Sequence, residues 1–191
     1  YTTDDEQSSQ PIMDHYTGVG DVAAVYNLTK FFDRYHAAFT LKRSRLVTWD
    51  EARSRDLIFI GAPLENPSLF ILPDSKDFNF VRDGDAFDIV NRRPQEGEPL
   101  RMIHDGWPMK VYYAIVSLRP GLEAGTKMLI FSGMTTIGTQ AAVEFACSLA
   151  GADQLLPPAI AETKPNFEAV LKVTVNSGVP VAFSIIAIHR S

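Results

Sequence analysis

Residues 129–142, LIFSGMTTIGTQAA, decide how the fold is interpreted. The apolar run 129–131 is typical of a buried strand, and Gly133 opens the segment that follows it. A helix pattern then extends from about 136 to 149. A glycine-containing loop at a helix N-terminus presents free backbone N–H groups, which is the context of a phosphate-binding loop. The stretch therefore predicts an α/β domain with a candidate ligand loop.

The chemistry of that loop is incomplete for nucleotide hydrolysis. A phosphate-binding loop of that class needs a Lys followed by Ser or Thr, and this chain has Thr139 and Gln140 there. Two interpretations remain open. The first is a weaker site for an anion or polar ligand, formed by Gly133, Thr135, Thr136, Gly138 and Thr139. The second is a tight turn that Thr136 caps, which we favour on the residues alone.

A second candidate loop lies upstream. The apolar run 57–60 predicts a buried strand, and Gly61 begins the loop that follows it. Open α/β sheets place ligand contacts after such strands, so Glu65 and Asn66 are further candidate ligand-binding residues. A rigid turn fixed by Pro63 and Pro67 is the alternative.

The rest of the chain alternates between helix and strand patterns. Apolar residues at three- and four-residue spacing predict a helix near 20–38, and Thr48 with Glu51 forms a capping box for a short second helix. Further strands are expected at 39–42, 78–81, 87–90, 112–116 and 127–131, with a closing hairpin formed by 167–176 and 179–189. We therefore expect an α/β fold with a three-layer Rossmann-like mixed sheet and a C-terminal antiparallel hairpin.

A G-x-G-x-x-A string begins at Gly18 and opens the first helix. A dinucleotide fingerprint needs a hydrophobic strand directly before it and an acidic residue about 20 positions on. Residues 11–13 make a poor strand, and residues 40–45 read TLKRSR. A plain glycine-rich helix entry is favoured, and a loop that lines a cleft beside the 133–140 turn is the alternative.

The amino-acid composition narrows the classes of partner that this chain is expected to bind. The 18 Lys and Arg against 23 Asp and Glu give a net charge of −5, which argues against nucleic acid as a partner. No run approaches the length of a membrane span. Residues 1–13 are expected to be a flexible lead-in and 14–191 a single domain of a length that buries a core. Because the chain begins at Tyr1 rather than Met, we expect a fragment of a larger protein. Whether that protein has a membrane anchor upstream is left open.

No catalytic set, metal site or cofactor is predicted. The four histidines are scattered at 15, 36, 104 and 189, and no H-x-x-x-H, C-x-x-C or G-x-S-x-G string accompanies them. Surface or capping roles are the favoured interpretation of these histidines. Cys147 lies inside a helix pattern and is expected to act as a small buried hydrophobe.

Two segments carry a resemblance: 56–67, DLIFIGAPLENP, and 128–142, MLIFSGMTTIGTQAA. From about Asp14 to Arg190 the chain resembles an uncharacterised bacterial domain. In the two segments alone it is also similar to some archaeal S-layer-type surface proteins. These resemblances imply a Rossmann-like domain used for binding or architecture, and they bring no catalytic residue.

Three hypotheses on function follow. The first is a non-enzymatic binding or sensory module that recognises a small polar ligand or a partner protein near 61–67 and 133–139. The second is an enzyme acting on a small phosphorylated or carboxylated substrate, against which stands the missing set of nucleophile, base and orienting group. The third is a structural domain of a surface or assembly protein.

Overall fold

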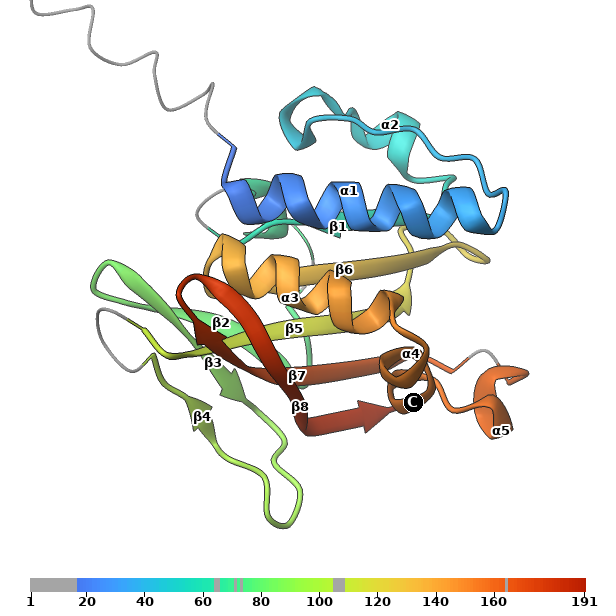
Figure 1. Ribbon diagram of the computed structural model, residues 1–191. Coiled ribbons are helices and arrows are strands. Elements are labelled where there is room, and N and C mark those ends of the chain that lie inside the picture. The colour runs from blue at the N-terminus through green and yellow to red at the C-terminus, as the bar shows by residue number, and fades with distance from the viewer. Residues whose placement is uncertain (1–16, 64–65, 71, 73, 105–108, 164) are drawn as a thin grey trace, which may run out of the picture.

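The computed structural model describes residues 17–63, 66–70, 72, 74–104, 109–163 and 165–191 (Figure 1). Its α-helices are α1 (Val19–Arg34), α2 (Trp49–Ala52), α3 (Thr136–Cys147), α4 (Leu149–Leu155) and α5 (Pro158–Ala161). Short 3-10 helices cover Ser44–Leu46 and Pro67–Phe70. The strands are β1 (Leu57–Ile60), β2 (Phe78–Asp83), β3 (Ala86–Asn91), β4 (Arg101–Met102), β5 (Val111–Pro120), β6 (Lys127–Gly133), β7 (Phe167–Asn176) and β8 (Val179–Arg190).

A five-stranded mixed sheet forms the centre of the fold, in the order β1-β6-β5-β7-β8. Strands β1 and β6 run parallel, whereas β6, β5, β7 and β8 pair antiparallel. The expected mixed sheet and closing hairpin are therefore both present. A Rossmann topology is not shown, because β1 and β6 form the single parallel pair among the described strands.

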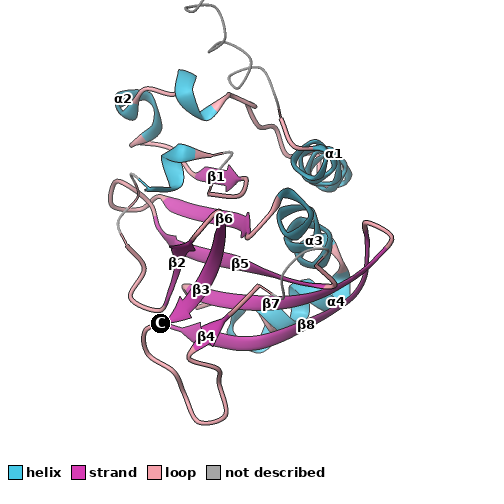
Figure 2. Cartoon of the chain, turned by 90° about the vertical axis from the view of Figure 1, so that its left-hand side faces the viewer, coloured by secondary structure: helices cyan, strands magenta, loops and turns pink. Residues whose placement is uncertain are grey.

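One face of the sheet packs against α1 and α3, as Figure 2 shows edge-on. Alternate strand residues such as Val116 and Leu171 are fully buried beneath Ala141 and Ala142 of α3. These small helix residues let α3 approach the sheet closely. Helix α1 in turn packs on α3 at its glycine-rich start, where a Cβ at Gly20 would lie 2.1 Å from the Thr136 carbonyl oxygen.

A second sheet, in the order β2-β3-β4, covers part of the opposite face (Figure 2). Phe78 and Ile89 of this sheet pack with Ile115 and Val170 of the central sheet in a separate apolar cluster. The molecule thus has three layers: the helices, the central sheet and the small sheet. The third layer is a β-sheet and not a second layer of helices.

Several predicted elements are confirmed, and others differ from the prediction. Thr48 Oγ1 accepts a hydrogen bond from the Glu51 amide, as the capping box predicts. Residues 39–42 form no strand, because they are exposed and have no pairing partner. The helix predicted over 136–149 is interrupted at Ser148, whose hydroxyl caps α4 by accepting a hydrogen bond from the Gly151 amide.

The strand predicted at 57–60 is also less buried than expected. Residues of β1 are mostly half-buried because β1 is an edge strand, paired with β6 alone.

Among the described helices, none has both the length and the apolar character required to span a bilayer.

Candidate functional site

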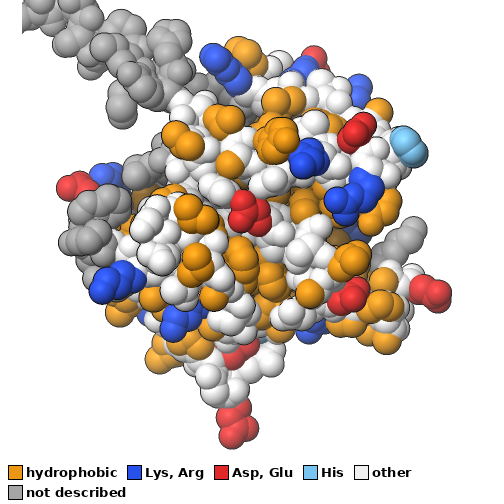
Figure 3. All heavy atoms as spheres, in the orientation of Figure 1, with side chains coloured by type: hydrophobic (Ala, Val, Ile, Leu, Met, Phe, Trp, Pro, Cys, Tyr) orange, Lys and Arg blue, Asp and Glu red, His pale blue; other side chains and the backbone are white. Residues whose placement is uncertain are grey.

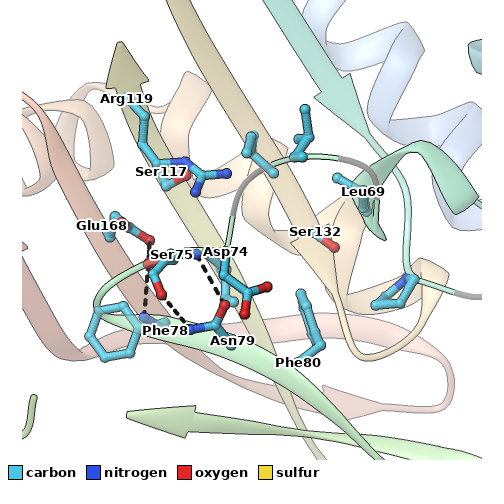
Figure 4. Close-up of a pocket in the computed structure, with 14 residues that line it drawn as sticks. Leu69, Asp74, Ser75, Phe78, Asn79, Phe80, Ser117, Arg119, Ser132 and Glu168 are labelled. Atoms are coloured by element: carbon cyan, nitrogen blue, oxygen red, sulfur yellow. Dashed lines mark hydrogen bonds between the residues drawn. The ribbon is translucent and has the colours of Figure 1, made fainter. Parts of the chain in front are cut away.

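A cavity of about 120 Å³ lies between the central sheet and the chain that leads into the small sheet (Figure 4). Its lining combines apolar and polar side chains in one concave surface: Pro63, Leu69, Leu72, Asp74, Ser75, Phe78, Asn79, Phe80, Ile115, Ser117, Arg119, Ile130, Ser132 and Glu168. An apolar pocket with a few convergent polar groups is typical of small-molecule sites.

Strand register explains how the polar groups of the cavity floor come together. Ser117 and Arg119 are two residues apart on β5, so they share one face of the sheet. Ser117 of β5 lies directly opposite Glu168 of β7, and Ile115 of β5 lies directly opposite Ser132 of β6. This face is turned away from α1 and α3, toward the cavity.

The opposite wall is a turn built around Ser75. Its hydroxyl donates to Glu168 Oε2 at 2.5 Å and accepts from the Asp77 and Phe78 amides at 2.9 and 3.1 Å. Asn79 holds the same turn by bonding both the amide and the carbonyl of Ser75 (Figure 4). Because two amides already occupy the lone pairs of the Ser75 hydroxyl, this oxygen is a poor nucleophile.

Arg119 and Glu168 are oppositely charged members of the lining. Burial raises the pKa of Glu168, although the Ser75 hydrogen bond and the charge of Arg119 oppose that rise. Burial also lowers the pKa of Arg119, and the charge of Glu168 opposes that change. Each group therefore compensates part of the desolvation of the other.

Ser132 contributes a buried hydroxyl to the lining. Its side chain is buried, with 1 % of the residue exposed, and its hydroxyl finds no hydrogen-bond partner among the described residues. A buried hydroxyl without a partner costs about 1–3 kcal/mol. Such a group beside a cavity is suited to a ligand or a water molecule.

Behind the Ser75 wall lies a buried group of charges around His189 of β8. Its Nδ1 is 2.7 Å from Asp77 Oδ1 and its Nε2 is 2.9 Å from Glu98 Oε2. Burial alone would lower the pKa of His189, but hydrogen bonds and charge from Glu98 and Asp77 outweigh burial and raise that pKa. Both ring nitrogens contact carboxylates, so this imidazole is arranged as an ion-pair partner and not as a general base for Ser75.

The sequence-predicted loops lie together at one edge of the central sheet. The Gly61 amide donates to the Phe131 carbonyl oxygen, so the 61–66 loop starts beside the loop that contains Gly133. Pro63, within the first loop, and Ser132, directly before Gly133, both line the cavity. Glu65 lies outside the described residues.

The described members of the predicted set bond to the protein's own backbone. Asn66 is buried, donates to the Ile60 carbonyl oxygen and accepts from the Ser68 amide. Thr139 is fully buried, and its hydroxyl accepts from the Gly133 amide at 3.1 Å.

The first turn of α3 is likewise closed by contacts within the chain. Thr135, rather than Thr136, is the residue that caps α3, by accepting from the Gly138 amide. A Cβ at Gly18 would lie 2.1 Å from Thr136 Cγ2, so the start of α1 covers the first turn of α3. The two glycine-rich segments therefore lie side by side and pack directly on each other.

One cluster of potential metal ligands consists of Asp83, Asp88 and His104, whose ligand atoms lie within 4.8 Å of one another. Asp88 is fully buried but already accepts hydrogen bonds from Arg101 Nε and from the His104 amide. Arg101 is also 3.6 Å from Asp83. A guanidinium therefore supplies positive charge to this acidic cluster.

Cys147 is half-buried at the end of α3. Burial raises the pKa of its thiol to about 11. The thiol is thus protonated at neutral pH and poorly reactive, in agreement with the packing role expected from the sequence.

The cavity residues were not among the candidates that the sequence singled out. Ser117 and Arg119 interrupt an otherwise apolar face of β5, whereas Glu168 lies on a face of β7 that also carries Lys172 and Thr174. A polar residue at an inward position of a central strand is the one signal that marks them. Pairing of β5 with both β6 and β7 is what turns these separate positions into one site.

No protein-family model, curated protein or solved structure matches this chain. The site must therefore be interpreted from its own chemistry.

Proposed function

We propose that the protein is a non-enzymatic binding module that holds a small polar molecule in the cavity between its two sheets. The observation that carries this proposal is the buried Ser132 hydroxyl, which lines the cavity and has no partner among the described residues. A ligand that bonds this hydroxyl removes the cost of leaving it unsatisfied. The apolar lining residues Leu69 and Ile130 would contact the ligand's carbon atoms.

The charges near the cavity favour binding over catalysis. Ser75 is the hydroxyl that lies nearest a carboxylate, but two backbone amides already bond its oxygen. His189, the one buried imidazole among the described residues, is held between two carboxylates. Nucleophile, base and orienting group are therefore not combined around an open space, which supports a sensory or binding role.

A partner protein is the other recognition mode within this proposal. The exposed face of α1 carries Val19, Val22 and Tyr26, and Figure 3 shows apolar side chains there among Lys, Arg, Asp and Glu side chains. Apolar residues mixed with charges in this way are ordinary for a protein surface. The cavity is the better supported recognition site.

The Rossmann-like relationship and the likeness to surface-protein domains belong to this proposal as well. The parallel pair β1-β6 and the loop that joins β6 to α3 support the Rossmann-like relationship, whereas the likeness to surface proteins rests on the sequence alone. Ligand contacts at the ends of such strands are consistent with a cavity that reaches Pro63 and Ser132.

A thermal-shift screen tests the proposed function. The protein is heated with amino acids, short carboxylates, amines, phosphorylated metabolites and sugars, because a ligand selective for the folded state raises the melting temperature. Ser132→Ala should weaken binding of a ligand by about 3–10-fold, the value of one hydrogen bond. Ser184→Ala, at an exposed serine of β8, is the matched control and should leave binding unchanged. A screen without any dose-dependent rise contradicts the proposal.

A further inference from the structure

We infer that the ligand of the cavity is a small zwitterion, an α-amino acid with a short apolar side chain, whose carboxylate faces Arg119 and whose ammonium group faces Glu168. This inference rests on the proposed function, because it names the ligand class of the same cavity.

The charges of the lining carry the first step. Arg119, Glu168 and Asp74 are the charged residues that line the cavity. Arg119 and Glu168 are close enough for each charge to act on the pKa of the other. A simple anion would be attracted by Arg119 but repelled by Glu168. A simple cation would be attracted by Glu168 but repelled by Arg119. A molecule with both charges a few ångströms apart complements both groups at once.

The placement of the two groups on the sheet supports this polarity. Glu168 is directly opposite Ser117 on the neighbouring strand, and Arg119 is two residues beyond Ser117 on β5. Figure 4 shows the Arg119 guanidinium lying beside Ser117 and extending toward the cavity, with the Glu168 carboxylate at the Ser75 wall. The positive and negative ends of the site are therefore separated across one stretch of the floor. Ser117 lies between them.

The other carboxylates near this end already have cationic partners. Asp74 is exposed and pairs with Arg92 at 3.2 Å, so its charge is largely balanced at the surface. Asp77, behind the Ser75 turn, pairs with Arg93 and His189. Glu168 is therefore the carboxylate of the lining that an ammonium group would meet.

Size and apolar surface define the side chain. A cavity of 150 Å³ in another protein accommodates benzene, so about 120 Å³ suits roughly five or six non-hydrogen atoms, as in glycine or alanine. Leu69, Leu72 and Ile130 offer apolar contact for one or two methyl groups. The Ser132 hydroxyl is then available to a carboxylate oxygen or to the ammonium group.

Isothermal titration of the wild-type chain with three matched ligands tests the inference. Alanine carries both charges, propionate lacks the ammonium group, and ethylamine lacks the carboxylate. Alanine should bind at least about 10-fold more tightly than either single-charge analogue, since each removes a charge-assisted hydrogen bond. Phenylalanine, whose ring exceeds this volume, should bind more weakly than alanine, and equally tight binding would contradict the size argument.

Two variants then assign the ends. Glu168→Gln keeps an acceptor for the Ser75 hydroxyl, and it should weaken alanine binding about 10-fold while leaving propionate binding equal or tighter. Arg119→Met keeps the length of the side chain and should give the reverse selectivity, with ethylamine favoured. Ser184→Ala is the control for handling and fold.

The outcomes separate this inference from the proposed function. If propionate, ethylamine or a neutral compound from the thermal-shift screen binds as tightly as alanine, the zwitterion inference is wrong and the binding function stands. If no compound binds at all, both are wrong. Tight alanine binding that neither Glu168→Gln nor Arg119→Met changes would also overturn the inference, because the charges would then play no part.

Discussion

His189 Nδ1 lies 2.7 Å from Asp77 Oδ1, and this contact ties the last strand of the central sheet to the segment that enters the small sheet. On its other side the imidazole meets Glu98, and Arg93 Nη2 meets the same Asp77 oxygen at 2.6 Å. The small sheet is thereby attached to the central sheet by charge as well as by the apolar cluster around Phe78. Since Asp77 follows directly on the Ser75 turn, the same contact supports one wall of the cavity.

Replacing His189 should therefore be costly. His189→Asn leaves two buried carboxylates short of a partner, and the free energy of unfolding should fall by about 3 kcal/mol. Urea denaturation at pH 6 measures the change. His36→Asn is the matched control, because His36 is exposed and has a left-handed backbone conformation that Asn tolerates, so stability should change little. Equal stabilities of the two variants would show that the His189 contacts contribute nothing.

The stabilising effect of His189 should depend on pH. Its pKa is raised in the folded protein by Glu98 and Asp77, against the effect of burial, while Arg93 opposite and Glu168 nearby also face this group of charges. A raised pKa means that the stabilisation is complete below the unfolded-state pKa of about 6.5 and is lost as the pH rises through the folded-state pKa. The difference in unfolding free energy between wild type and His189→Asn should thus be largest near pH 6 and shrink toward pH 9. A constant difference contradicts this assignment.

The contribution of Asp88 to the free energy of unfolding should have the opposite pH dependence. Burial would raise the pKa of Asp88, but hydrogen bonds from His104 and Arg101 outweigh burial and lower it. Asp88→Asn should lower the free energy of unfolding by about 1.5–3 kcal/mol at pH 7, the value of hydrogen bonds to a charged group. A lowered pKa means that this stabilisation is present above the unfolded-state pKa of about 4 and disappears as the pH falls through the folded-state pKa.

Chemical denaturation of wild type and Asp88→Asn at pH 7, 5 and 3 measures this change. Asp85→Asn, in the exposed β2-β3 turn, is the control and should be neutral at each pH. A loss of stability in Asp88→Asn that persists unchanged at pH 3 would show that packing, not charge, is the cause.

Gly20 tests the contact between α1 and α3. Glycine to alanine inside a helix normally stabilises by about 0.5–1 kcal/mol. At Gly20 the new Cβ would lie 2.1 Å from the Thr136 carbonyl oxygen, so the helices must separate. Gly20→Ala should therefore lower the free energy of unfolding by about 1–3 kcal/mol. Thermal denaturation measures this change. Val22→Ala, on the exposed side of α1, is the control and should be nearly neutral. A Gly20→Ala variant that is more stable than wild type would refute the close contact.

Local patterns predicted the elements well where local forces decide them. The first helix, the Thr48 capping box and the C-terminal hairpin depend on periodicity, a cap and a turn, each of which lies within a few residues. The strand expected at 39–42 failed because pairing with a distant strand decides whether such a segment is extended.

The cavity could not be predicted in the same way. Ser75, Ser117, Arg119, Ser132 and Glu168 come from four separate segments, and their meeting depends on the order and register of β5, β6 and β7. The sequence pointed instead to the loop before α3, where glycines and threonines form a familiar local pattern. In the structure Thr139 and Thr135 use their side chains to close that loop.

Two buried hydroxyl groups, one on each side of this loop, separate a structural role from a ligand-binding role. Thr139→Val preserves the shape of the side chain and removes the acceptor of the Gly133 amide, so the free energy of unfolding should fall by about 1–3 kcal/mol. Ser132→Ala removes a hydroxyl that has no partner among the described residues, so without ligand its stability should equal or slightly exceed that of wild type. Urea denaturation of both variants, with and without the best compound of the thermal-shift screen, gives the comparison. Ligand should stabilise Thr139→Val as much as wild type and Ser132→Ala less. If Ser132→Ala instead unfolds more easily without ligand, its hydroxyl is already satisfied within the protein and the cavity loses the observation on which the binding proposal depends.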